Sequence, residues 1–151
     1  MELSTKILSI ATDMGLPVIH GTAEQLAVLV DTVKTPCCAL LDYGSSTMVQ
    51  HGPQRVEQVA LCAFFLERVS PSFSPDETQA VYERMRRCAD DFLDRVHGVD
   101  DPTYSTLRVD GDARYDRVNL RYKGVYGGIM VTATVIDLQG FCAPSSIFSD
   151  L

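Results

Sequence analysis

The side chains that could bind a metal ion are three histidines and five cysteines. A protein metal site needs such ligands at short, defined intervals, as in HxH, HxxxH or CxxC pairs. His20, His51 and His97 stand far apart in the chain, and the cysteines contain no CxxC pair. The sequence therefore predicts no metal centre.

A cysteine could also act as a nucleophile, which requires a base within hydrogen-bond reach of the thiol. Neither the adjacent pair at 37–38 nor the segment Cys-Ala-Pro at 142–144 carries a local signature of such a site. An odd number of cysteines, some within apolar patterns, instead favours reduced, buried thiols of the kind found in cytosolic proteins. The five are Cys37, Cys38, Cys62, Cys88 and Cys142.

Two glycine-containing segments resemble nucleotide-binding loops only superficially. The segment GSST at 44–47 lacks the lysine and the glycine spacing of a Walker motif. The segment GVYGG at 124–128 falls between two expected strands, where a hairpin turn or bulge is the ordinary interpretation. The sequence thus predicts no catalytic residue and no cofactor.

The composition is that of one acidic domain. The chain has 151 residues, 20 acidic against 13 basic side chains, and a formal net charge of −7. This balance disfavours broad binding to a nucleic-acid backbone, which needs clustered lysine and arginine. It is compatible with a surface past which DNA slides without binding, and equally with simple solubility. The first residues, MELSTKILSIATDMG, do not predict a signal peptide, and no apolar stretch predicts a membrane span.

Three segments carry helix patterns. Residues 3–14 place apolar side chains at three- and four-residue spacing, and a capping-box pattern at Thr22 precedes residues 23–33, for which a strand is the alternative. The strongest pattern begins at Ser74 with N-cap, proline and capping-box signals, and it predicts a helix over 75–97.

Acidic and basic residues alternate along that third helix. One interpretation is a solvated face with i,i+4 pairs such as Asp91–Arg95 and Glu83–Arg87. The other is a charged face that docks a neighbouring subunit.

Strands are expected over 37–43, 55–69, 104–109, 113–121 and 129–136. Residues 55–69 are apolar on both faces, which is typical of a central strand. The polar segment 44–54 is either a long hairpin loop or a hairpin tip with ragged strands. The order α-α-β-β-α-β-β-β predicts an α+β fold, a single domain over 1–151 with an antiparallel or mixed sheet and helices packed on one face. Residues 140–151 are expected to form an extended, apolar C-terminal tail.

Residues 36–135 contain three successive stretches: PCCALLDYGSSTMVQHGPQRVEQVALCAFFLERV, then SPDETQAVYERMRRCADDFLDRVHG, then YSTLRVDGDARYDRVNLRYKGVYGGIMVTATV. Their layout resembles the small tail-terminator, or tail-completion, proteins of long-tailed bacteriophages and prophages. The resemblance implies a structural virion protein rather than an enzyme, assembled in the host cytoplasm. It would form a ring, commonly a hexamer, that caps the tail-tube protein and meets the neck or connector protein. Genomic DNA would pass through the lumen without sequence-specific binding.

Other functions remain open. A head–tail connector (neck) subunit shares the assembly logic and differs only in partner. A small enzyme or ligand-binding domain, with Cys142 or a histidine at a pocket, and a small acidic inhibitor are alternatives from other classes.

The segment 44–54 and the tail 140–151 are the candidate contact surfaces. A closed ring is built from contacts between unlike patches, and an apolar tail is a plausible patch for the next protomer. We expect deletion of residues 140–151 to weaken the oligomer. Light scattering measures this directly, and an unchanged mass would contradict it.

Overall fold

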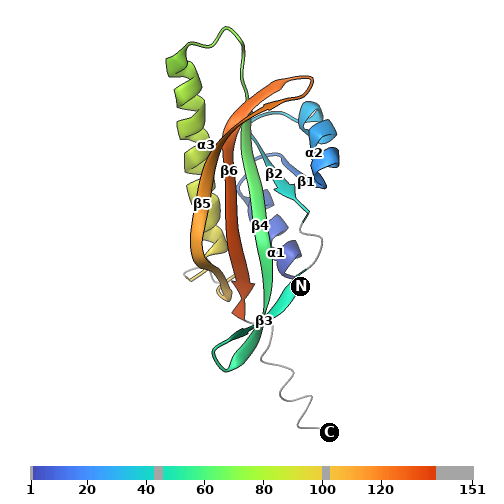
Figure 1. Ribbon diagram of the computed structural model, residues 1–151, viewed down its shortest axis with the longest axis vertical. Helices are drawn as coiled ribbons and strands as arrows, with labels where there is room; N and C mark the ends of the chain where they lie inside the picture. The colour runs from blue at the N-terminus through green and yellow to red at the C-terminus, as the bar shows by residue number, and fades with distance from the viewer. Residues whose placement is uncertain (1, 43–45, 100–102, 139–151) are drawn as a thin grey trace.

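The computed structural model describes residues 2–42, 46–99 and 103–138, which form a six-stranded sheet flanked by three α-helices (Figure 1). In chain order the elements are α1 (Leu3–Asp13), β1 (Val18–Gly21), α2 (Ala23–Leu29), the 3-10 turn η1 (Val30–Thr32), β2 (Cys37–Leu41), β3 (Thr47–His51), β4 (Gln54–Arg68), α3 (Pro75–Val96), β5 (Leu107–Arg121) and β6 (Val125–Asp137). The predicted α+β class and the order of its elements are confirmed.

The sheet is mixed, with the strand order β1-β2-β4-β6-β5 and β3 paired to the start of β4. Only β1 and β2 run parallel, and the other pairs are antiparallel. β4 lies between β2 and β6, which confirms the central position that its two apolar faces predict.

One face of the sheet packs against α1 and α3. Alternate residues of β4 and β6 point toward these helices, because successive side chains of a strand face opposite sides. Phe65 of β4 and Phe92 of α3 are both fully buried, and their ring centroids lie 5.5 Å apart. This layer is the main core of the protein.

A second, smaller cluster lies on the opposite face. Here α2 and η1 cover one end of the sheet through Leu26 and Val30, which pack with Cys37 and Tyr126. The sequence places all helices on one face, whereas α2 lies on the other. The cause is the alternation in β2, which directs Cys38 toward the main core and Cys37 toward α2. The rest of this second face has no helix above it among the described residues.

The third helix begins as its sequence predicts. The hydroxyl of Ser74 accepts a hydrogen bond from the backbone N–H of Glu77, and the Glu77 carboxylate accepts one from the N–H of Ser74. Pro75 occupies the first helical position. The helix ends at Val96, close to the predicted boundary.

Several strands depart from the sequence expectations. β1, which is not among the strands expected from the sequence, pairs with β2. Within residues 23–33 the chain forms α2 and η1, so the helix expected there is confirmed and its strand alternative is wrong. β5 is one strand where two were expected, because the residues between the expected strands form a bulge with a register shift between Asp110 and Arg114. Gly111 has φ of 77°, a left-handed value that glycine adopts without strain.

The glycine-rich segment at 124–128 is mostly strand rather than turn. β6 begins at Val125, four residues before the expected start at Ile129, so Gly127 and Gly128 lie inside the strand. The turn itself is formed around Gly124, whose carbonyl accepts from the N–H of Tyr122.

Candidate functional site

The three histidines lie on different elements and do not come together. His20 is an exposed residue of β1, and His51 ends β3. His97 follows α3, and its Nδ1 accepts a hydrogen bond from the N–H of Val109 at 3.0 Å. His97 therefore ties the end of α3 to β5. Within residues 2–42, 46–99 and 103–138 no group of His, Cys, Asp and Glu has the geometry to hold a metal ion.

The four cysteines of the described ranges are free thiols. Burial raises the pKa of Cys37 to about 11, and it raises the pKa of Cys38 further, assisted by the neighbouring thiols. Burial also raises the pKa values of Cys62 and Cys88. A raised pKa keeps a thiol protonated and unreactive at neutral pH. Cys142, named above as a possible pocket residue, lies outside the described residues.

A carboxylate fastens η1 to the turn between β5 and β6. Asp31 accepts hydrogen bonds from the N–H groups of Lys123 and Gly124 and from the hydroxyl of Tyr126, the last at 2.6 Å. The Tyr126 bond, followed by those two N–H groups, holds the pKa of Asp31 below its ordinary value against the opposing effect of desolvation. Burial and the same carboxylate raise the pKa of Tyr126 to about 12. The Asp31 carboxylate thus has a structural role, because its hydrogen bonds join η1 to the turn between β5 and β6.

The uncovered part of the second sheet face forms a shallow hollow, which we call the open half-sheet. Its floor consists of Ala60 and Cys62 from β4 and Thr132 and Thr134 from β6, all small side chains. Charged residues stand on its rim: Asp42, Asp112 and Arg114. A floor of small, partly exposed side chains offers a flat surface on which another chain can lie.

An apolar cleft separates the open half-sheet from α2. It has a volume of about 130 Å³, and its lining includes Leu26 of α2, Leu41 of β2, Phe64 of β4 and Leu120 of β5. The cleft and the open half-sheet adjoin at β2, since Leu41 lines both.

A second groove lies between α3 and β5 on the opposite side of the sheet, and we call it the arginine groove. Its lining residues are Tyr82, Glu83, Arg86, Arg87, Arg117 and Ile129. Two of the guanidinium groups rest on aromatic rings, with Arg86 4.0 Å from the ring centroid of Tyr115 and Arg117 4.9 Å from that of Tyr82. Such stacking holds a cation in place while leaving its N–H groups available.

The charged face of α3 contains part of the expected pairing. Asp91 and Arg95 form the predicted i,i+4 pair at 3.1 Å, and Arg86 approaches Asp90 at 3.4 Å. In place of the expected Glu83–Arg87 ion pair, Arg87 donates a hydrogen bond to the backbone carbonyl oxygen of Glu83. The solvated-face interpretation therefore accounts for the second half of the helix, while the first half forms a wall of the arginine groove.

The segment 44–54 contributes a hairpin, in line with the second of its two predicted forms. β3 pairs with the first residues of β4 around a turn at Gly52, which has φ of 61°. The pairing of β4 with β6 starts only at Glu57, so among the described residues Gln54–Val56 pair with β3 alone. Figure 1 shows this hairpin at one end of the molecule, beyond the tip of β6. We call residues 47–56 the hairpin arm.

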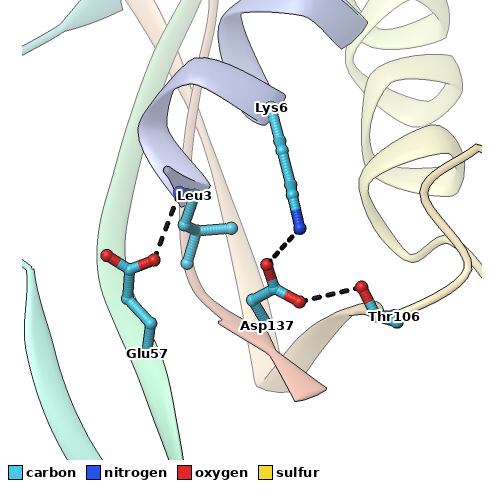
Figure 2. A network of polar contacts seen from close by, with 5 residues as sticks. All are labelled: Leu3, Lys6, Glu57, Thr106 and Asp137. Carbon is cyan, nitrogen blue, oxygen red and sulfur yellow. Dashed lines mark hydrogen bonds and ion pairs between the residues drawn. The ribbon is translucent and has the colours of Figure 1, made fainter. Parts of the chain in front are cut away.

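A network of polar contacts lies at the base of the hairpin arm (Figure 2). The Lys6 ammonium of α1 meets the Asp137 carboxylate of β6 at 2.5 Å, and the Thr106 hydroxyl donates to the same carboxylate at 2.8 Å. Beside them the Leu3 N–H donates to Glu57 at 3.2 Å. Asp137 is only 3% exposed and is the one buried charged residue in the described part of the chain. The network joins α1, β4 and β6 where the arm leaves the body.

No protein-family model matches the chain, and no curated protein matches it. None of the helices described here combines the length and the apolarity needed to cross a bilayer.

Of the two contact surfaces expected from the sequence, the structure describes most of one and none of the other. The segment 44–54 is largely the hairpin arm, whereas the tail 140–151 lies outside the described residues. The open half-sheet was not predicted, and of the arginine groove only the wall formed by α3 was expected, as a charged face. Both depend on which strands become neighbours, and only the interleaving of tyrosine with arginine in α3 and β5 is visible in the sequence.

Proposed function

We propose that this chain is a tail-terminator subunit of a long-tailed bacteriophage, a structural virion protein whose ring caps the tail tube and joins it to the head connector. The observation that carries the proposal is the hairpin arm, together with the resemblance in layout over residues 36–135. In this role the arm contacts the tail-tube protein or the adjacent subunit.

The arm has the character of a segment that is completed by a partner. A two-stranded hairpin is marginally stable in water unless a third strand or another layer supports it. At the end of the arm, β4 has β3 as its only strand neighbour among the described residues. Met48 of β3 is 50% exposed, and a flexible apolar side chain of this kind suits a contact surface. Assembly would cover it.

Other features support the same role. The net charge of −7 is compatible with a lumen through which genomic DNA passes without being bound. The raised pKa values of the Cys37 and Cys38 thiols and the structural hydrogen bonds of Asp31 explain the presence of these side chains without a catalytic role.

The decisive experiment mixes the purified chain with polymerising tail-tube protein. A terminator is expected to bind tube ends and stop elongation, which electron microscopy of tube lengths and end-on rings measures. Binding to portal or adaptor protein without binding to tubes would identify a neck subunit instead. Failure to bind any of these partners would refute the assembly role.

Replacing Met48 with aspartate is expected to lower affinity for the tail-tube protein about tenfold, because it puts a charge into an apolar contact. The fold should tolerate the change, since exposed substitutions alter stability by only about 0.5 kcal/mol. Val28→Asp is the matched control: Val28 is 68% exposed, but it lies on α2. Binding assays on both variants test the arm, and equal affinities for the two would remove it from the interface.

A further inference from the structure

We infer that copies of this chain associate head to tail through charge: the arginine groove of one copy binds the acidic β5 bulge, Asp110 and Asp112, on the open half-sheet of the next. The inference deepens the proposed function, on which it rests for its biological meaning, by naming the contact between ring neighbours. Its partner is a second copy of this chain, recognised through carboxylates.

The groove is prepared for carboxylate binding. Guanidinium groups bind carboxylates through paired N–H donors, and the gain is larger when the side chain is already held in place. Arg117 rests over Tyr82, and Arg86 rests over Tyr115. The Tyr115 hydroxyl is itself fixed, since it donates to Asp90 at 2.7 Å. Less side-chain entropy is therefore lost on binding than for free arginines.

The positive charge of the groove is only partly neutralised from within the chain. Arg86 shares Asp90 with Tyr115, and Glu83 is the acidic residue in the lining. In the described part of the chain Arg117 makes no ion pair, and Arg87 bonds to a backbone carbonyl. The groove can thus accept one or two further carboxylates.

Negatively charged side chains that complement the groove lie on the other side of the same sheet. Asp110 is paired with Thr134 of β6, whose side chain forms part of the open half-sheet floor, and Asp112 lies on the rim. Both are exposed, and neither forms an ion pair with another described residue. Arg114 does not neutralise them, because its guanidinium is paired with Asp116 at 2.9 Å. The bulge at Gly111 interrupts the register between Asp110 and Arg114, so Asp112 has no paired residue on β6.

The placement of the two patches determines the symmetry. The arginine groove lies on the α3 side of the sheet and the acidic bulge on the opposite side. A contact between unlike patches on opposite faces is heterologous, and repeated copies then form a closed ring or a filament. Nucleic acid fits the groove less well, because backbone binding needs an extended basic surface and this one includes Glu83 and Asp90.

The test uses a charge exchange in the full chain. Arg117→Asp and Asp112→Arg are each expected to weaken self-association about tenfold or more, because each places like charges in contact. An equimolar mixture of the two variants is expected to restore it, since each variant then meets an opposite charge on its neighbour. Sedimentation across protein concentrations measures both effects, and added salt should weaken the wild-type assembly.

Controls separate this contact from general effects of charge. Lys34→Asp and Asp13→Arg make matched changes at exposed positions outside both patches and should leave association unchanged. Circular dichroism and thermal melting establish that every variant is folded. A wild-type chain that stays monomeric, single variants that associate like wild type, or a mixture that fails to recover would each overturn the inference.

The outcome is distinguishable from failure of the proposed function. Wild-type chain that caps tail tubes while Arg117→Asp still associates normally would keep the function and remove this contact. Recovery in the mixture, with no binding to tail tubes, would keep the contact and remove the function.

Discussion

Replacing Gly128 with alanine is expected to prevent stable folding. A methyl group at this position would lie 1.8 Å from the carbonyl oxygen of Phe65 and 2.9 Å from its carbonyl carbon, both in the neighbouring strand β4. These are backbone atoms of the central strand, so relief requires β4 and β6 to separate. The expected loss is about 4 kcal/mol or more, a large part of the 5–15 kcal/mol that stabilises a typical domain.

The adjacent glycine provides the control for this prediction. A Cβ at Gly127 would meet the Cγ1 atom of Val69 at 3.3 Å, which a small side-chain movement relieves. Gly127→Ala should therefore melt within a few degrees of wild type, while Gly128→Ala is recovered in aggregates or without a cooperative transition. A Gly128→Ala protein with a near-normal melting temperature would show that the β4–β6 spacing is not fixed as described.

Local signals explain what the sequence predicted well. The start of α3 depends on Ser74, Pro75 and Glu77, which act on one another within a single turn, so the helix is visible without knowledge of its neighbours. The central position of β4 was visible because both of its faces are apolar. These features need no knowledge of the tertiary fold.

Non-local pairing explains what the sequence did not predict. β1 has four residues and is a strand because β2 lies beside it, a partner that its own sequence does not specify. Gly128 was expected in a hairpin turn or bulge, whereas the requirement for glycine there comes from the close approach of Phe65 in β4, which the local sequence does not show. The same holds for surfaces: the arginine groove exists only once Arg117 of β5 lies beside Arg86 of α3. The segment 44–54, which contains most of the hairpin arm, was expected as a long loop or a hairpin tip because its polar residues and turn signals are contiguous.

Replacing Lys6 with methionine is expected to destabilise the protein by about 3–5 kcal/mol, the usual cost of removing one member of a buried ion pair. The Lys6 side chain is 12% exposed and that of Asp137 only 5%, so water cannot readily replace the lost ammonium group (Figure 2). The hydrogen bond from Thr106 remains, but it does not supply the missing positive charge. Chemical denaturation measures the change in the free energy of unfolding.

Two further variants make this prediction specific. Lys34→Met removes an exposed lysine and should change stability by no more than about 0.5 kcal/mol. Combining Lys6→Met with Asp137→Asn removes both charges, so the double variant should be less destabilised than the sum of the single changes. Additive losses, or a Lys6→Met protein as stable as the Lys34→Met control, would contradict a coupled buried pair.

The location of this pair gives its loss a functional consequence under the proposed role. Lys6 and Asp137 join α1 to the end of β6, next to Glu57, where pairing of β4 with β6 begins and the hairpin arm leaves the body. Loosening this end should therefore release the arm before α3 and the far end of the sheet unfold. We expect hydrogen exchange in Lys6→Met to rise first in residues 47–58, together with a loss of tail-tube binding. Uniform acceleration across the chain would instead show that the pair stabilises the whole fold rather than the base of the arm.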